Sequence, residues 1–481
     1  MTSTVRNPEP RRPWQAVLVL LTVAGISFAL MQTLVVPALP FFQREFGTSA
    51  SGATWLATGF LLSSSVLTPL LGKLGDTYGK KRLLAISLTV FGLGSLGATL
   101  SWDLGSLVAF RVLQGAGAAV FPLSFGIIRD EFPPEKVGLG IGTVSSVFGA
   151  GGGIGLVLSG VILEHLDWHW LFLVGGIPVL VAATLIVLFV PESPASRPAK
   201  ADYLGAATLS VALAALLLGI SQGNVWGWGS GGVLGLLAAA AVLLGAWIAI
   251  ERRVPEPMVD LVMLSRPKMA ATNAIAMLVG FSMFSTFISL PNFVQVPERV
   301  GFGFGASLLE TGLYFLPSSL AMMVLGPFAG ALGDRLGAVV PLRIGLGSAA
   351  TGLVLFALVH SEPWQVLAWV TLLGVGIAFA FASIGKLAVD NARPSETGVA
   401  TGINTIMRTI GAALGAQIAA TIISAKTLAG SGLPAEAGFT AAFAMGAIGA
   451  TVALGPTLVL TRGERGRSEP IPPEAQAEPV A

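Results

Sequence analysis

The sequence predicts an all-α integral membrane protein, and three observations support that fold class. Of the 481 residues, 54% are hydrophobic and only 11% are charged, whereas a soluble protein carries about 25% charged residues. The apolar residues gather in fourteen runs, each long enough to cross a bilayer as a helix of about 20 residues. Two short motifs also recur once along the chain at a nearly constant separation. We therefore expect 14 transmembrane helices, arranged as two pseudo-symmetric six-helix bundles plus two inserted helices.

The spans are expected in a regular order along the chain. The first six lie near 14–39, 52–72, 83–101, 105–128, 137–162 and 169–190. Two more lie near 203–221 and 231–250, and the last six lie near 269–293, 306–330, 341–359, 364–388, 398–424 and 437–460. Each span should be a helix, because backbone polar groups cannot stay unpaired in hydrocarbon.

These runs divide the chain into five parts. Residues 1–13 are expected to form a cytoplasmic tail, and residues 14–190 the first six-helix bundle. Residues 191–268 form a linker with the two inserted helices, and residues 269–460 form the second bundle. Residues 461–481 are charged and proline-rich, a composition typical of disordered tails.

The positions of Lys and Arg predict the orientation. If the N-terminus lies in the cytoplasm, 21 of the 27 basic residues fall in cytoplasmic segments. Three fall outside and three fall within spans, the last being Arg111, Lys386 and Arg408. Because basic residues favour the cytoplasmic side, we expect both termini there and place the protein in the cell inner (plasma) membrane. Lys386 and Arg408 are expected to extend toward the cytoplasm from the inner ends of their spans.

Two motifs indicate that the chain is an internal duplication. The run GKLGDTYG at Gly72 returns as GALGDRLG at Gly330, 258 residues later. Three glycines return 260 residues later, since Gly142, Gly151 and Gly155 are matched by Gly402, Gly411 and Gly415. Repeated halves around a site near the bilayer midplane are typical of secondary transporters.

On these motifs the chain resembles a major facilitator superfamily transporter of the fourteen-span drug:proton antiporter branch. The resemblance extends from Trp14 to Leu460, and its most specific part is the run from Gly72 to Arg82. The run FRVLQGAGAAVFP at Phe110 is similar to the family's fourth-span motif. The resemblance implies export of small molecules by alternating access, in exchange for protons.

The resemblance also implies a gating loop at the cytoplasmic surface. Its residues would be Gly72, Asp76, Gly79, Lys80 and Arg82, with Asp334 in the second copy. In the family the acidic residue pairs across the seam between the halves in the outward-open state. Glycines allow the tight turn, and an acid near a helix N-terminus is stabilised by the helix dipole. The alternative is a loop that only anchors the topology.

The six repeated glycines resemble the fifth-span motif associated with exporters. We expect Gly142, Gly151 and Gly155 to lie near one helix face, where small residues let another helix approach closely. Leu156 and Ser159 depart from the family pattern, in which proline and glycine occupy these positions. The alternative is plain helix packing without a role in antiport.

Proton coupling has no obvious carrier in this sequence. The usual first-span Asp of the family corresponds here to Met31. The remaining candidates are Arg111, whose family counterpart assists proton transfer, and Glu310 near the outer end of the tenth span. Glu310 could pair with Arg111 or could be a solvated helix-end residue. Arg111 could instead extend outward to the interface.

The substrate is expected to be small and hydrophobic or amphipathic. Met and aromatic side chains repack around varied apolar molecules, and a few polar groups could orient the substrate. The candidates for the cavity are Met31, Gln32, Phe281, Phe284, Asn292 and Asn404.

Other classes of function fit the composition poorly. The net charge of +2 does not suggest nucleic-acid binding, and the three histidines fall in loops without a third metal ligand. We therefore expect no metal, no cofactor and no enzymatic activity, and a protein that functions as a monomer in the lipid bilayer. The alternatives are a metabolite or lipid carrier without proton coupling and a membrane-embedded enzyme.

Overall fold

The computed structural model describes residues 13–192, 202–255, 257–428 and 433–461. The predicted tails fall outside these ranges apart from residues 13 and 461, and so does part of the predicted linker. Within the described residues, fourteen helices are long and apolar enough to cross a membrane. This confirms the predicted all-α membrane fold.

The first half contributes six spans. They are α1 (Trp14–Leu34), α3 (Ala50–Tyr78), α4 (Lys80–Ala98), the composite α5 (Leu104–Gln114), η1 (Gly115–Ala119) and α6 (Val120–Glu131), then α7 (Val137–His165) and α8 (Trp170–Phe189). The short α2 (Leu39–Glu45) follows α1, and η2 (Pro134–Lys136) precedes α7. The inserted helices are α9 (Tyr203–Trp226) and α10 (Gly231–Glu251).

The second half repeats this order. Its spans are α12 (Pro267–Val294), α13 (Leu308–Leu336), α14 (Val339–Leu358), α15 (Pro363–Asp390), α16 (Thr397–Ala425) and α17 (Glu436–Val452), which α18 (Thr457–Thr461) extends. Three short elements, α11 (Leu261–Ser265), η3 (Glu298–Val300) and η4 (Pro394–Glu396), connect them. Gly79 ends α3 at φ 105° and Gly337 ends α13 at φ 81°. Glycine adopts this backbone conformation at little cost, so both copies of the motif end their helix in the same way.

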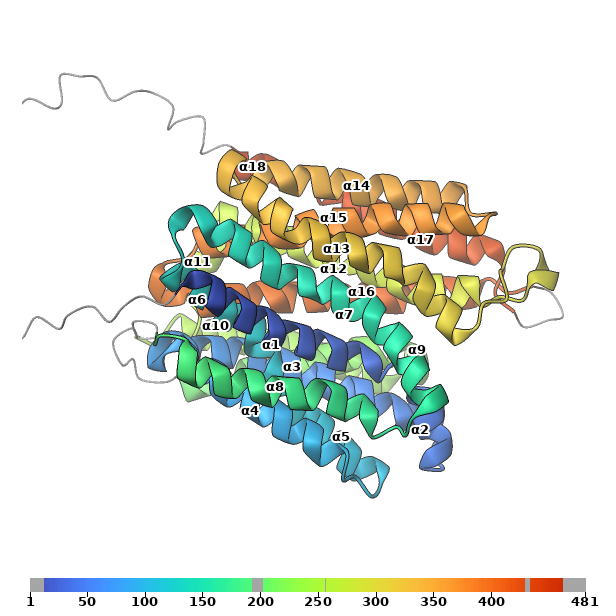
Figure 1. Cartoon of the computed structure of the whole chain (residues 1–481), viewed down its shortest axis with the longest axis horizontal. Coiled ribbons are helices and arrows are strands. Elements are labelled where there is room, and N and C mark those ends of the chain that lie inside the picture. Colours follow the sequence, from blue (N-terminus) through green and yellow to red (C-terminus); the bar gives the residue numbers. More distant parts are fainter. Residues whose placement is uncertain (1–12, 193–201, 256, 429–432, 462–481) are drawn as a thin grey trace, which may run out of the picture.

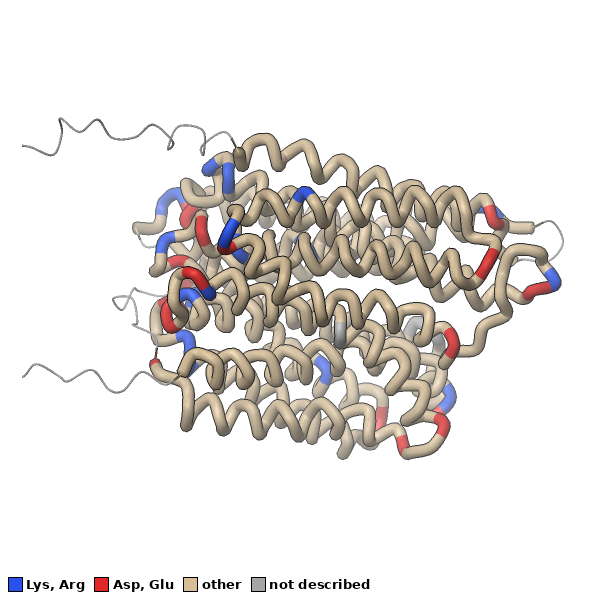
Figure 2. The backbone as a smooth tube through the Cα atoms, turned by 45° about the horizontal axis from the view of Figure 1, so that its top comes forward, with Lys and Arg blue, Asp and Glu red and all other residues tan. Residues whose placement is uncertain are grey.

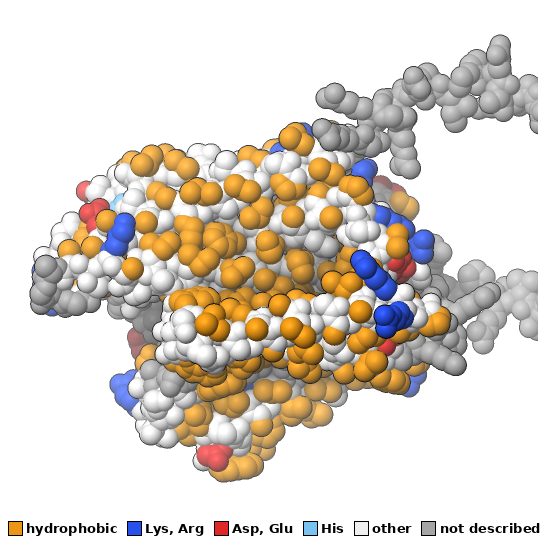
Figure 3. All heavy atoms as spheres, turned by 180° about the vertical axis from the view of Figure 1, so that it is seen from behind, with side chains coloured by type: hydrophobic (Ala, Val, Ile, Leu, Met, Phe, Trp, Pro, Cys, Tyr) orange, Lys and Arg blue, Asp and Glu red, His pale blue; other side chains and the backbone are white. Residues whose placement is uncertain are grey.

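The long helices run side by side along the longest axis of the molecule (Figure 1). Most Lys and Arg residues gather at one end of the bundle (Figure 2), which we call the basic end and define by Lys80, Arg129, Lys386 and Arg393. Apolar side chains cover the side of the bundle between the two ends (Figure 3). Exposed apolar residues of the spans include Val187, Val242 and Val324, as expected for a surface that meets lipid rather than water.

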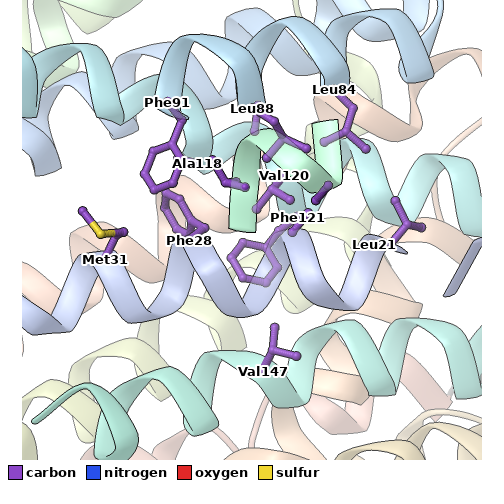
Figure 4. Packing of buried hydrophobic residues seen from close by; sticks show 14 of the residues in the cluster. Leu21, Phe28, Met31, Leu84, Leu88, Phe91, Ala118, Val120, Phe121 and Val147 are labelled. Atoms are coloured by element: carbon purple, nitrogen blue, oxygen red, sulfur yellow. The ribbon is translucent and has the colours of Figure 1, made fainter. Parts of the chain in front are cut away.

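Each half has its own buried apolar core. In the first half the Phe28 ring of α1 packs against Phe60, Phe91 and Phe121, with centroids 5.7 to 5.9 Å apart. Figure 4 shows Phe28 next to Phe91 and, above α7, Phe121 facing Val147. In the second half Phe293, near the end of α12, packs against Phe356, Phe439 and Phe443. The bundle limits 14–190 and 269–460 stay a prediction.

Several helix pairs meet at the seam between the halves, and two of them, α7–α13 and α3–α16, differ in how far their contact extends. Along α7 and α13 the contact runs the whole length, from Gly138 beside Asp334 at the basic end to Gly160 beside Leu309 at the opposite end. Along α3 and α16, Gly72 packs on Gly398 and Pro69 on Gly402. Beyond Thr68, toward the opposite end, residues of these two helices line a cavity instead.

The inserted helix α9 lies against both helices of this second seam. The Asn224 Nδ2 group donates a hydrogen bond to Gln417 Oε1 on α16, at 2.8 Å. Thr421 Oγ1 donates to Asn224 Oδ1 at 2.7 Å. Helix α10 packs on α9, so the insert borders the cavity on the side where α3 and α16 separate.

Candidate functional site

Asp76 joins the two halves at the basic end. Its side chain is buried, and its two carboxylate oxygens accept hydrogen bonds from the backbone N–H groups of Gly398 and Val399, at 3.0 and 3.1 Å. These N–H groups belong to the first turn of α16 and have no partner within that helix. The negative charge therefore caps a helix N-terminus in the other half and is stabilised by the helix dipole.

Asp334 makes the same contact in the opposite direction. It accepts hydrogen bonds from the N–H groups of Gly138 and Leu139, in the first turn of α7, at 2.8 and 3.0 Å. The acceptor positions differ by 258 residues and the donor positions by 260, which matches the repeat in the sequence. The basic end is thus closed by two symmetric carboxylate–helix contacts.

A lysine neutralises each of these carboxylates. Lys80 Nζ lies 2.7 Å from Asp130 Oδ2 and 3.8 Å from Asp76 Oδ1. Lys386 Nζ lies 3.3 Å from Asp334 Oδ1 and also reaches Asp390. Lys386 therefore lies at the basic end, where this pair of acids holds its ammonium group at the seam; its extension toward the cytoplasm stays a prediction.

Two further residues of the basic end differ in their roles. Arg129 adds a further contact from the first half to the second. Its guanidinium donates to the carbonyls of Val389 and Ala392 and to Thr397 Oγ1, at 2.8 to 2.9 Å. Arg82 is exposed, and the structure gives it no part in the closure. Of the predicted gating residues, Gly72, Asp76, Gly79, Lys80 and Asp334 therefore lie at the closed end, but Arg82 does not contact it.

We expected the repeated glycines to lie near one helix face, but the structure shows that they do not. Gly142 packs on Gly326 and Gly330 of α13, across the seam, whereas Gly151 and Gly155 pack on α1 of their own half. Nine residues at 100° each turn the helix by about half a circle, which places the first glycine opposite the second. The second half repeats this split, because Gly402 faces α3 across the seam while Gly411 and Gly415 pack on α12.

The two departures from the family motif are accommodated in α7. Ser159 Oγ donates a hydrogen bond to the Leu34 carbonyl of α1, at 2.8 Å. Leu156 is buried in a cluster that otherwise belongs to the second half. Helix α7 continues without interruption from Val137 to His165.

A cavity of about 260 Å³ lies between the halves. Helices α1, α3, α6 and α7 line it from the first half, α12, α15 and α16 line it from the second, and α9 contributes Leu217 and Ser221. The wall is mostly apolar, with phenylalanines from both halves. Its residues include Phe28, Phe60, Phe121, Phe148, Phe284, Phe287 and Phe381.

Two of the six predicted cavity residues, Gln32 and Phe284, line this cavity. Met31 is fully buried and packs on Gly175 of α8, away from the cavity. Phe281 faces α17, where its ring approaches Gly449. These two predictions were wrong because hydrophobicity alone does not tell which side of a helix faces the seam.

The two predicted asparagines also lie elsewhere. Asn404 Nδ2 donates to Asn273 Oδ1 at 3.0 Å, a buried hydrogen bond that joins α16 to α12. Asn292 is exposed and donates to the Ile288 carbonyl one turn earlier. Neither asparagine is among the residues that line the cavity.

Arg111 is fully buried behind the cavity wall. Its guanidinium donates to the carbonyls of Leu56 and Met31, at 3.0 and 3.3 Å, and to Gln114 Oε1 at 2.6 Å. Its Cζ lies 4.3 Å from the ring centroid of Phe60, which lines the cavity. The alternative in which Arg111 extends to the interface does not describe this structure.

Glu310 does not meet Arg111. It is exposed at the start of α13, where its carboxylate accepts from the Ser307 N–H at 2.7 Å and its own N–H donates to Ser307 Oγ. This reciprocal pair is a capping box. Glu310 is therefore a solvated residue at a helix end, and the predicted ion pair between Glu310 and Arg111 was wrong.

The sequence predicts that Arg408 extends toward the cytoplasm, but in the structure it belongs to the cavity instead. It lines the cavity, and its guanidinium carbon lies 5.1 Å from the Phe148 ring centroid and 4.7 Å from that of Phe381. Arg408 lies eleven residues after the start of α16, which places its backbone about 16 Å from the basic end at 1.5 Å per residue. An arginine side chain cannot cover that distance, so Arg408 does not reach the basic end.

The fold and the site together define a membrane transporter with two related halves around a central cavity. The chain belongs to the Major Facilitator Superfamily, whose family profile matches residues 21–416. This match confirms the resemblance seen in the motifs. The chain is accordingly a transporter and not an enzyme.

Two similar proteins are named for export or drug resistance. The chain is 30% identical over 394 residues to the tetracenomycin C resistance and export protein of Streptomyces glaucescens, a match that covers 81% of this chain and 72% of that protein. It is 28% identical over 391 residues to multidrug resistance protein 3 of Bacillus subtilis, covering 80% and 74%.

A solved structure shares the fold. The crystal structure of the human organic anion transporter MFSD10 (TETRAN) aligns with a TM-score of 0.66 at 16% identity, covering 94% of this chain and 100% of that chain. At this identity the likeness concerns the fold alone.

Proposed function

We propose that the chain is a secondary active exporter of drugs or natural products, and that it exchanges its substrate for protons by alternating access. We place it in the cell inner membrane with the basic end and both termini in the cytoplasm, following the distribution of Lys and Arg. Each copy encloses a cavity between its own two halves, so we propose that one copy is sufficient for transport.

The observation that carries this proposal is the difference between the two ends of the α3–α16 seam. At the basic end Asp76 and the Gly72–Gly398 contact close the seam, whereas farther along the same helices line the cavity. A rocking motion of the halves would break the contacts of Asp76 and Asp334 and open the cavity to the cytoplasm. The export relatives named above support the direction of transport.

Protons can act through the same two carboxylates. A protonated carboxyl loses the charge that attracts a helix N-terminus and forms weaker hydrogen bonds with N–H donors. Protonation of Asp76 or Asp334 would therefore favour an open basic end. Arg111 does not act on this step directly, because it bonds to the Leu56 carbonyl, about 30 Å along α3 from Asp76 at 1.5 Å per residue.

The acids at the opposite end are poor proton carriers. The backbone N–H and the hydroxyl of Ser106 lower the pKa of Asp103. The backbone N–H of His169 lowers the pKa of Asp167 in the same way. Both carboxylates therefore stay charged at neutral pH.

The test is transport in everted membrane vesicles that contain the full chain. Fluorescent aromatic dyes of both charges would be offered, with and without a protonophore. The proposal expects protein-dependent uptake of at least one dye and its loss when the proton gradient is collapsed. Absence of protein-dependent transport across the panel would reject an exporter of this class.

A second candidate function is a carrier without proton coupling. It is favoured by the cavity wall, whose described lining residues include neither Asp nor Glu, and by Met31 at the position of the family's usual acid. In this case the vesicles would transport the dye at the same rate with or without the protonophore.

A further inference from the structure

The guanidinium of Arg408 has no partner of opposite charge within the described part of the chain. It lies beside the rings of Phe148 from α7 and Phe381 from α15, one from each half, which also contact each other edge to face. Among the same described residues it makes neither an ion pair nor a side-chain hydrogen bond. A guanidinium has five N–H donors, so a charged group with unused donors faces the cavity at the seam.

Arg111 shows what a satisfied arginine looks like in the same protein. It is more deeply buried than Arg408, and three acceptors, the carbonyls of Leu56 and Met31 and the Gln114 amide, receive its N–H groups. Leaving a charge unpaired at membrane depth is costly, and such residues normally mark a substrate pathway. The contrast indicates that the acceptors for Arg408 come from a bound molecule.

Arg408 is also the only charged residue among the described residues that line the cavity. The other lining residues are apolar or neutral, so the cavity carries a single positive charge. Two of them have polar groups without a protein partner in the described chain, namely the amide of Gln32 and the hydroxyl of Ser64. A lipophilic cation would meet repulsion here and no compensating carboxylate.

The positions along the helices give the cavity a direction. Arg408 lies about 16 Å from the basic end, whereas Gln32 lies eighteen residues into α1, about 27 Å from that end at 1.5 Å per residue. The charged group is thus at the deep end of the cavity. The rings of Phe28, Phe121, Phe284 and Phe287 line the space that an apolar body would fill.

We propose that Arg408 binds the anionic group of the substrate, and that the exported molecules are aromatic compounds that carry a carboxylate or phenolate rather than a positive charge. Arg pairs with a planar carboxylate through two parallel N–H···O bonds, and the Arg408 guanidinium, packed beside two phenyl rings, has N–H donors that no described residue accepts. This inference rests on the proposed export function and names the substrate class of the same cavity.

The test uses two xanthene dyes with similar aromatic bodies and opposite charges, fluorescein and rhodamine 6G. Binding to the purified full chain is measured at pH 8 by fluorescence anisotropy, in detergent supplemented with zwitterionic lipid only. We expect the unmodified protein to bind fluorescein at least tenfold more tightly than rhodamine 6G. The Arg408→Gln variant should lose at least tenfold in affinity for fluorescein and nothing for rhodamine 6G, and Arg408→Lys should fall between.

A second variant keeps Arg408 but gives its guanidinium a carboxylate partner from the protein itself. Thr405 lines the cavity one turn before Arg408, and side chains three residues apart on a helix can pair. Thr405→Asp should therefore weaken fluorescein binding as strongly as Arg408→Gln does. Arg343→Gln is the matched control, because Arg343 is exposed on α14 and bonds to Thr457; this variant should bind both dyes normally.

The outcomes separate this inference from the proposed function. Preference of the unmodified protein for rhodamine 6G, or equal loss of both dyes in Arg408→Gln, would overturn the anion site. Protonophore-sensitive export of a cationic dye that ignores Arg408 would also overturn it while keeping the exporter. Arg408-dependent fluorescein binding without any vesicle transport would keep the site and reject the exporter.

Discussion

Lys80 and Lys386 place their ammonium groups at corresponding points of the two halves, although they come from helices that do not correspond. Lys80, on α4, lies between Asp76 and Asp130, and Lys386, on α15, lies between Asp334 and Asp390. Both acids recur at the repeat offset, but neither lysine does. The charge cluster has been kept while its cation has moved from one helix to another.

This relationship predicts a rescue by exchange of positions. Lys80 corresponds to Ala338 in the second half, and Lys386 corresponds to Gly126 in the first. A Cβ atom on Gly126 would lie 2.5 Å from the Lys80 side chain, so the glycine now leaves room for that lysine. Lys80→Ala should weaken closure of the basic end, because removing one partner of a buried ion pair costs about 3–5 kcal/mol. Adding Gly126→Lys to it should restore most of the loss.

The measurement uses the absence of cysteine from the chain. Ser65→Cys places a single thiol on the cavity wall, and an impermeant maleimide added from the basic side reports opening of that end. Lys80→Ala should label faster than the parent, and the double variant should label at the parental rate. A double variant that labels as fast as Lys80→Ala would show that the position of the lysine matters and not only its charge.

Asp76 and Asp334 are expected to contribute equally to closure. Each caps a helix of the other half through two N–H groups at 2.8 to 3.1 Å. Replacing either with Asn keeps the shape but removes the charge–dipole attraction, which is worth up to about 2 kcal/mol when partly buried. In the Ser65→Cys background, each single variant should label roughly tenfold faster at the introduced thiol, since about 1.4 kcal/mol is a factor of ten. A normal rate in Asp334→Asn alone would mean that only the first copy of the motif acts as a gate.

Much of the fold was predictable because membrane helices follow from apolar length alone. All fourteen spans were located, and the largest errors lie at their ends, as in α3, which continues to Tyr78 rather than stopping near 72. Charged residues such as Lys73 and Asp76 extend that helix beyond the apolar run. A hydropathy pattern does not record such an extension, since it is stabilised by contacts at the seam.

The closed end was predictable where the repeat marks it, whereas only Gln32 and Phe284 of the cavity wall were predicted. Asp76 and Asp334 were found through their shared offset, and Asp130 and Asp390 could have been found in the same way, because they are 260 residues apart. Phe381 shares this signal, because Phe121 lies 260 residues before it, but Arg408 and Phe148 correspond to each other and differ in type, so the repeat does not mark them. Their role depends on which face of each helix meets the other half, and an apolar membrane helix has little amphipathic pattern to indicate it.

Glu310 is expected to have no role in proton coupling, and its replacement tests this. Glu310→Gln should leave both the transport rate and its pH dependence unchanged, because Gln at this position preserves the capping box and the carboxylate lies far from any cavity charge. Ser307→Ala is the matched variant, which should lower the melting temperature through loss of a cap worth about 0.5–2 kcal/mol. A shifted pH profile in Glu310→Gln would return this residue to the list of proton carriers.

Adjacent glycines of α7 separate close packing from helix propensity. A Cβ atom on Gly151 would overlap Ala29 of α1, whereas one on Gly152 would meet no atom within 4 Å. Overpacking a tight contact costs about 1–3 kcal/mol, and replacing a helical glycine with alanine gains about 0.5–1 kcal/mol. Gly151→Ala should therefore lower the melting temperature of the purified protein in detergent, and Gly152→Ala should raise it slightly. Because both variants add one methyl group to the same helix turn, equal melting temperatures would mean that α1 and α7 are not in close contact at Gly151.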